Sequence, residues 1–219
     1  MITKLVKYYL RRKKAFKENQ QLNYVIDYLK KDNRSNLVII DLGFNVGRVY
    51  RAIDENVKYK KYWGFEIQKD LYEKSKDFNN TSLEVIHGAV TDFEGDTSYH
   101  EPLKWSPNSK NYKGGSTLMQ DKTNSSNHAI SVRAIDLAEW LVKNIEDNDQ
   151  VFMKVDIEGA EYHLLEHLIV TGKLSVINSI AIEWHSNKFG LENEAQYLAR
   201  KNIIKLKIWE SGIRYFEWF

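Results

Sequence analysis

Apolar residues recur along the chain with two different periods, and each change of period marks an expected element. Short runs of apolar, β-branched residues predict strands near 37–43, 62–66, 83–90, 151–156 and 179–185. Between them, apolar residues three or four positions apart predict helices near 47–55, 70–78, 136–144 and 160–170. Strands that alternate with helices indicate a parallel sheet covered by helices, so the expected fold class is α/β.

The two ends of the chain depart from this alternation. Residues 1–35 carry apolar stripes at helical spacing and predict an N-terminal helical extension before a main domain at 36–219. At the other end, a helix is expected near 191–201, followed by the β-rich runs IIKLKIW and IRYFEWF with the turn-like ESG between them. Such a pair predicts an antiparallel hairpin. The whole pattern predicts a seven-stranded, mostly parallel sheet that ends in this hairpin.

The stretch from about residue 91 to 131 loses its apolar periodicity and is rich in Gly, Ser, Asn and Lys. We interpret residues 97–128 within it as an insertion or lid on the main domain. Trp105 and Tyr112 could stack on a sugar ring or a nucleobase there, or pack the insertion onto the domain.

Composition limits the kind of partner and the compartment. Its 219 residues suit one domain, and 42% hydrophobic residues suit a globular core. The net charge of +2 gives no overall attraction to a polyanion, although residues 11–14 form a local basic run. The absence of cysteine excludes disulfides and Cys-bound zinc and favours a cytoplasmic setting. No signal peptide or transmembrane segment is expected, and the oligomeric state stays open.

The first expected strand ends in DLGFNVG, residues 41–47, at the transition to a helix. Gly43 and Gly47 would let the backbone turn sharply and approach a ligand, and Asp41 could face a cationic amino group. These features suit the zwitterionic tail of S-adenosylmethionine, whereas neither a P-loop nor a G-x-G-x-x-G sequence is present. About 20 residues later, Glu66 could accept hydrogen bonds from both ribose hydroxyls. The alternative is a merely structural turn with an exposed strand-end charge.

The third expected strand ends in His87-Gly88-Ala89-Val90. Ligands of parallel α/β sheets bind beyond the carboxyl ends of the strands, so the backbone of Gly88 and Ala89 is expected to contact the adenine. His87 itself could equally be a histidine at the edge of the core.

A second charged motif, FMKVDIEGAE, occupies residues 152–161. Side chains alternate along a strand, so Lys154 and Asp156 are expected on one face. Glu158 and Glu161 follow in the loop and the first helical turn, where the helix dipole favours carboxylates. Four charged groups therefore converge on one edge of the predicted sheet.

With these two motifs the chain resembles the FkbM family of methyltransferases, which carry D-x-G-x-N-x-G and K-x-D-x-E-G-x-E. The segments 64–66, 87–96, 114–118, 132–141 and 180–185 are also similar, whereas the family usually has a small residue at the position of Phe44. The resemblance implies a class I, Rossmann-like methyltransferase that uses S-adenosylmethionine. It implies cofactor contacts at Asp41, Gly43, Asn45, Gly47 and Glu66, and places Asp156, Glu158 and Glu161 at the junction of cofactor and acceptor. The full set of expected cofactor-binding residues is Asp41, Gly43, Phe44, Asn45, Gly47, Glu66, Ile67, Gly88, Ala89, Asp156 and Glu161.

The expected reaction is transfer of a methyl group to a hydroxyl. Alignment of the two reactants can supply on the order of 7–11 kcal/mol, more than a general base does. The candidate bases are Asp156, His185 and Glu183, with the first two preferred. Lys154 either lowers the pKa of the acceptor hydroxyl or pairs with a carboxylate. Asp156, Glu158, Glu183 and His185 could also hold a divalent cation such as Mg²⁺.

Several acceptors and functions stay open at this level. The resemblance favours a hydroxyl of a sugar, glycan or other small molecule, with a ribose 2′-hydroxyl of nucleic acid second and protein acceptors also open. A nicotinamide-dependent oxidoreductase is disfavoured because the dinucleotide fingerprint is missing. A non-catalytic Rossmann-like binding module is the remaining alternative.

Overall fold

The structure is a computed structural model that describes residues 17–31, 35–78, 80–103, 115–120 and 122–218. The basic run at 11–14 and the expected stacking residues Trp105 and Tyr112 lie outside this part of the chain. Residues 17–31 form a helix, within the segment expected to be helical. Over the described residues, no helix has both the length and the apolarity needed to cross a bilayer.

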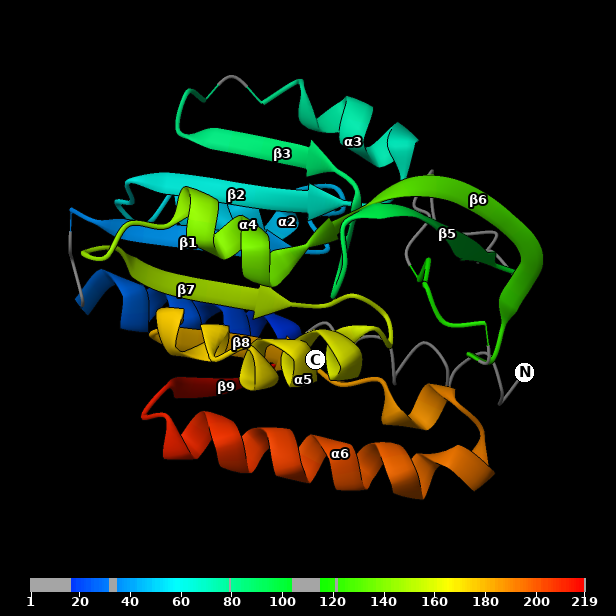
Figure 1. The fold of residues 1–219 in the computed structure, drawn as a ribbon. Coiled ribbons are helices and arrows are strands. Elements are labelled where there is room, and N and C mark those ends of the chain that lie inside the picture. Colours follow the sequence, from blue (N-terminus) through cyan, green and yellow to red (C-terminus); the bar gives the residue numbers. More distant parts are fainter. Residues whose placement is uncertain (1–16, 32–34, 79, 104–114, 121, 219) are drawn as a thin grey trace, which may run out of the picture.

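The main sheet confirms the expected α/β, Rossmann-like class. Its strands are β1 (Leu37–Leu42), β2 (Lys61–Glu66), β3 (Leu83–His87), β7 (Gln150–Val155), β8 (Ser179–Glu183) and β9 (Arg214–Trp218). The strand order is β3-β2-β1-β7-β8-β9, and every neighbouring pair is parallel. The chain leaves β1 toward β2 on one side and reaches β7 on the other (Figure 1). This is the switch point where ligands bind in open α/β sheets.

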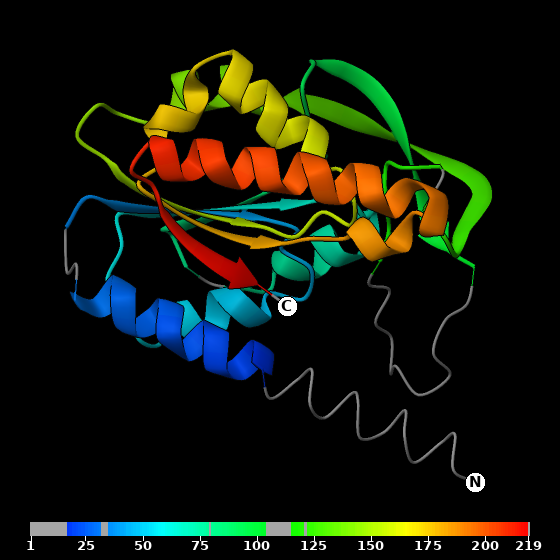
Figure 2. The ribbon, with the colours of Figure 1, turned by 90° about the horizontal axis from the view of Figure 1, so that it is seen from below.

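Helices cover both faces of this sheet and make it the middle of three layers (Figure 2). One face packs on α4 (Leu137–Asn144), α5 (Glu161–Val170) and α6 (Leu191–Glu210), and the other on the helix at 17–31 and α2 (Arg48–Asp54). Alternation along β1 explains the layers. Val38, Ile40 and Leu42 enter the first core, whereas Leu37 and Ile39 enter the second. The short α3 (Lys69–Ser75) connects β2 to β3.

The expected antiparallel hairpin at the end of the chain is wrong. The run IIKLKIW belongs to the 20-residue helix α6, and only Tyr197, Ile204 and Ile208 of that helix are buried. Because this helix carries the chain back along the sheet, β9 joins β8 in parallel. The main sheet therefore has six parallel strands among the described residues, not seven with a terminal hairpin.

A second, three-stranded sheet lies beyond the carboxyl ends of the main strands (Figure 1). It contains β4 (Ala89–Thr91), β5 (Gly95–Pro102) and β6 (Ser125–Asp136), with β4 parallel and β5 antiparallel to β6. The expected continuous strand at 83–90 is thus broken at Gly88, where a side chain would overlap Ile135. The described parts of the expected insertion at 97–128 are also more regular than predicted, since β5 and β6 pair across it.

The remaining short elements are the 3-10 turns η1 (Lys173–Val176) and η2 (Ser186–Lys188). The first joins α5 to β8, and the second follows β8 directly at the edge where the site is built. The expected strand at 179–185 therefore ends at Glu183, and His185 lies just beyond it.

Candidate functional site

A cavity of about 950 Å³ opens at the carboxyl edge of the main sheet. Its walls come from the β1–α2 loop, the end of β2, the β3–β4 junction, the β7–α5 loop and the end of β8. Another side, next to the second sheet, is closed by Gly115, Ser116, Leu118 and residues 122–124. The volume falls within the range of small-molecule and cofactor sites, and the position is the one expected for a sheet of this topology.

The β1–α2 loop turns sharply under this cavity because of Gly43. Its φ of 87° lies in the left-handed region, and a Cβ at this position would overlap the carbonyl oxygen of Asp156. The loop from β1 therefore runs directly against the loop from β7. Phe44 buries its ring above Gly64, where no side chain occupies the space, so this bulky residue is accommodated by the glycine on the neighbouring strand.

Glu66 links the end of β2 to this loop. The backbone N–H of Asn45 donates to its Oε2 at 2.7 Å, and that of Gln68 donates to Oε1 at 2.8 Å. Burial raises the pKa of Glu66 to about 7, although both hydrogen bonds oppose the change. A buried carboxylate with one hydrogen bond to each oxygen keeps lone pairs for further donors from the cavity.

Asp41 does not face the cavity, contrary to the expected contact with a cationic tail. Its carboxylate accepts hydrogen bonds from Lys154 Nζ at 3.0 Å and from the Tyr62 hydroxyl at 2.8 Å, and the residue is 1% exposed. Lys154 also donates to the carbonyl of Gly43 at 3.1 Å. Burial alone would lower the pKa of Lys154, but the charges of Asp41 and Asp156 outweigh it and raise that pKa.

His185 is oriented by Glu161. Glu161 Oε1 accepts from the backbone N–H of His185 at 2.9 Å and lies 3.1 Å from its Nδ1, while Oε2 accepts from the N–H of Gly159 at 2.7 Å. This arrangement places the proton of a neutral imidazole on Nδ1 and the lone pair on Nε2. Nε2 is buried and has no hydrogen-bond partner among the described residues.

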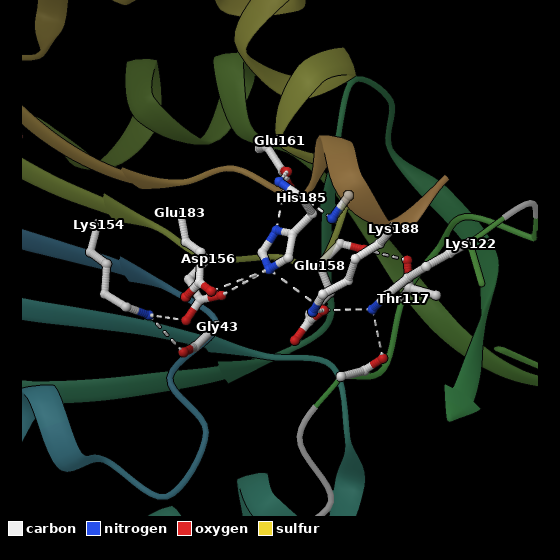
Figure 3. Close-up of polar contacts among 12 residues, drawn as sticks. Gly43, Thr117, Lys122, Lys154, Asp156, Glu158, Glu161, Glu183, His185 and Lys188 are labelled. Carbon is white, nitrogen blue, oxygen red and sulfur yellow. Dashed lines mark hydrogen bonds and ion pairs between the residues drawn. The ribbon is translucent and has the colours of Figure 1, made fainter. Parts of the chain in front are cut away.

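Three carboxylates surround this Nε2 atom (Figure 3). Its nearest oxygens on Glu158, Glu183 and Asp156 lie at 3.6, 3.7 and 3.9 Å. Glu158 Oε2 also accepts from Lys122 Nζ at 2.5 Å and Lys188 Nζ at 3.0 Å. Burial would raise the pKa of Glu158, but positive charge on His185, and then on Lys122 and Lys188, lowers it to about 2.

The structure brings most of the expected site residues to the cavity wall and leaves others behind it. The wall contains Gly43, Phe44, Asn45, Glu66, Ile67, Gly88, Ala89, Lys154, Asp156, Glu158 and Glu183. Behind it, and outside the cavity lining, lie Asp41, Gly47, Glu161 and His185. Gly47 is the N-cap residue just before α2, with a φ of 70°, and a Cβ at this position would overlap the ring of Phe78. His87 lies at the edge of the core, where its ring stacks on the ring of Tyr72.

Sequence reasoning missed two lysines that line the cavity, Lys122 and Lys188. Lys122 is 6% exposed and also donates to the carbonyl of Gly115 at 3.0 Å. Its sequence neighbourhood has no apolar period, so nothing in the pattern indicated burial. Lys188 lies three residues beyond His185, and η2 was not expected there.

Comparison with known proteins agrees with this geometry. The family model described as the methyltransferase FkbM domain matches residues 41–203, which include both charged loops and the carboxyl edge of the sheet. Searches of curated proteins and of solved structures found no significant match. The match spans most of the chain, and the chain is therefore a methyltransferase that belongs to the FkbM family.

Proposed function

We propose that this protein transfers the methyl group of S-adenosylmethionine to a hydroxyl of a sugar, glycan or other small molecule. One observation carries the proposal: a single cavity joins a buried carboxylate that suits a ribose, Glu66, to a second group of carboxylates at Asp156, Glu158 and Glu183. The first end supplies a place for the cofactor and the second a place for the acceptor.

The residues at the first end fit the cofactor. Glu66 retains lone pairs for two ribose hydroxyls, and Gly88 and Ala89 offer backbone and a small side chain to the adenine. Asn45 and Gly43 line the same cavity, which continues from these residues to Asp156. Asp41 supports this loop through Lys154, because that lysine holds the Gly43 carbonyl.

The chemistry requires an acceptor oxygen aligned with the methyl group. S-adenosylmethionine supplies a methyl carbon on a positively charged sulfur. When a hydroxyl accepts this group, an O–C bond forms, the S–C bond breaks with its electron pair left on sulfur, and the hydroxyl proton goes to a base. Gly43 lies so close to the backbone of Asp156 that the β1–α2 loop and the β7–α5 loop hold each other in place. Such a rigid arrangement favours alignment of the methyl group with the acceptor oxygen.

The geometry favours a carboxylate over His185 as the group that contacts the acceptor. Asp156 and Glu183 line the cavity, whereas His185 is 1% exposed and lies behind them. A base must come within hydrogen-bond reach of the proton it removes. His185 is therefore better placed to act through its neighbours than to touch the acceptor.

The acceptor end favours a polyhydroxylated molecule over nucleic acid. Its carboxylates accept hydrogen bonds from hydroxyls, and Lys122 and Lys188 supply donors. Three clustered carboxylates repel a phosphate backbone, whose binding depends on basic side chains.

Isothermal titration with S-adenosylmethionine and S-adenosylhomocysteine tests the cofactor. Saturable binding is expected, weakened at least about tenfold in Glu66→Ala, which loses hydrogen bonds to two hydroxyls. Glu84→Gln on β3 serves as the control, since Glu84 pairs with Lys61 at the surface. Failure of the wild type to bind either compound overturns the proposal.

A second assay tests the acceptor with a radiolabelled methyl group. Mono- and oligosaccharides, small polyols and short RNAs are incubated separately with the protein and the labelled cofactor. The proposal expects label on a carbohydrate or polyol oxygen. Label on RNA alone overturns the acceptor class, and cofactor binding without transfer to any compound supports a binding module.

A further inference from the structure

The acceptor end of the cavity contains a group of possible metal-ligand atoms that lie close to one another. One ligand atom each from Asp156, Glu158 and His185 lies within 4.8 Å of the other two. The separations of 3.6 and 3.9 Å from Nε2 to the two carboxylates are too long for hydrogen bonds. Donors that share one cation at about 2.1–2.4 Å stand about 3–4 Å apart, which matches these separations.

The imidazole gives a second, independent indication of a ligand. His185 is 1% exposed, its Nδ1 is committed to Glu161, and its Nε2 has no hydrogen-bond partner among the described residues. A buried ring nitrogen whose lone pair lacks a donor is unfavourable unless something occupies the space in front of it. Metal-binding histidines commonly give their other nitrogen to a carboxylate, as His185 does with Glu161.

The charges around these atoms leave room for a positive ion. The described residues gather five carboxylates and three lysines here: Asp41, Asp156, Glu158, Glu161 and Glu183, with Lys122, Lys154 and Lys188. Two negative charges are left over when the imidazole is neutral, and one is left over when it is charged. Lys122 and Lys188 contact Glu158, and Lys154 contacts Asp41 and Asp156. None of these three lysines donates a hydrogen bond to His185 Nε2.

We infer that Asp156, Glu158 and His185 bind one divalent cation at the acceptor end of the cavity. Two carboxylates and one imidazole suit a transition-metal ion such as Mn²⁺ more than Mg²⁺ or Ca²⁺, because both of these ions prefer oxygen ligands alone. The role of the ion rests on the proposed function: it would hold the acceptor hydroxyl as a further ligand and make its proton easier to remove. Glu183 lines the same part of the cavity and would receive that proton.

Binding of Mn²⁺ to chelator-treated full-length protein tests the site directly. The free Mn²⁺ signal in electron paramagnetic resonance is followed as protein is added, with Asp156→Asn and Glu158→Gln alongside and Glu84→Gln as the control. One ion per chain is expected, with affinity reduced at least about tenfold in the two site variants and unchanged in the control. Circular dichroism verifies that each variant is folded.

Spin-echo modulation of the bound Mn²⁺ then tests the histidine. Coupling to an imidazole nitrogen is expected in the wild type and its loss in His185→Gln. No saturable binding, binding that persists in both carboxylate variants, or bound Mn²⁺ without nitrogen coupling overturns the inference. Titration of S-adenosylhomocysteine into the same samples separates the two proposals, because it reports the cofactor end whether or not the ion binds.

Discussion

Lys154 on β7 and Asp41 on β1 are direct neighbours across two parallel strands, and their side chains form a buried ion pair of 3.0 Å. The pair lies under the loop that was expected to hold the cofactor and fixes that loop from below through the Gly43 carbonyl. Asp41 is thus placed as a support for the site.

The first prediction concerns this pair. Asp41→Asn removes the nearer counter-charge of the buried Lys154 and leaves only Asp156, at 3.5 Å. This change is expected to cost about 3 kcal/mol of unfolding free energy, measured by urea denaturation. Asp41→Asn combined with Lys154→Met should recover part of this loss, because the buried ammonium is then removed together with its partner. A single variant with wild-type stability but no affinity for S-adenosylhomocysteine would instead make Asp41 a direct cofactor ligand.

The second prediction uses the pKa of Glu66, which burial raises to about 7. Ribose hydroxyls donate to the ionised carboxylate, so binding favours the deprotonated form. The affinity for 5′-methylthioadenosine, which lacks the titrating amino-acid tail, should rise roughly tenfold from pH 6 to pH 8 and then level off. Calorimetry at several pH values measures it.

Glu66→Gln is the matched control for that pH dependence, since the amide does not titrate in this range. Its affinity should be lower than that of the wild type at pH 8 and nearly constant with pH. An equal rise in both proteins would assign the effect to another group.

The third prediction compares two glycines that both have a positive φ. Gly43 and Gly212 both have left-handed φ values, 87° and 70°, but a Cβ at Gly43 would overlap the Asp156 carbonyl, whereas none of the described atoms lies within 4 Å of one at Gly212. Gly212→Ala should cost about 1–2 kcal/mol, the strain alone. Gly43→Ala should cost more than about 4 kcal/mol. Equal losses in urea denaturation would contradict the tight contact.

The fourth prediction concerns Glu161, which holds His185 from behind. Glutamine offers one carbonyl oxygen where glutamate offers two, so Glu161→Gln leaves one of its N–H partners facing an amide donor. The affinity for Mn²⁺ should fall about 10–100-fold, with S-adenosylhomocysteine binding retained.

Glu166→Gln on the same helix is the control for this change. Glu166 pairs with Arg200 on the outer side of α5, away from the cavity. If both variants bind Mn²⁺ as the wild type does, Glu161 has no part in positioning His185.

Much of the parallel sheet could be predicted because its strands are short apolar runs and its helices have a clear period. The region near residue 205 could not. In α6 the exposed Ile203, Leu206 and Trp209 stand among the buried Ile204 and Ile208, so the run reads as a continuous β-rich segment. The helix forms because it packs against the sheet, and this tertiary contact cannot be inferred from the local sequence pattern.

The loops and residue types of the site could be predicted from the sequence, but the positions of the individual side chains could not. The two charged motifs indicated which loops meet, because the carboxyl ends of neighbouring parallel strands share one edge. They did not indicate which side chains are buried behind the cavity wall. Asp41 and Glu161 are acidic residues of the kind that contact ligands, yet Asp41 is buried against Lys154 and Glu161 against His185, and both partners come from distant segments. Lys122 became part of the site only through the second sheet.

The connection between β5 and β6 of that second sheet adds one wall to the cavity. The carboxylates of the acceptor end come from loops of the main sheet, whereas Gly115, Ser116, Leu118 and residues 122–124 lie between β5 and β6 in the sequence. Substitutions or length changes in this connection can therefore remodel that wall while the main-sheet loops keep their framework. Under the proposed function, a lineage would acquire new acceptors by altering one peripheral connection, without rebuilding the loops proposed to hold the methyl donor.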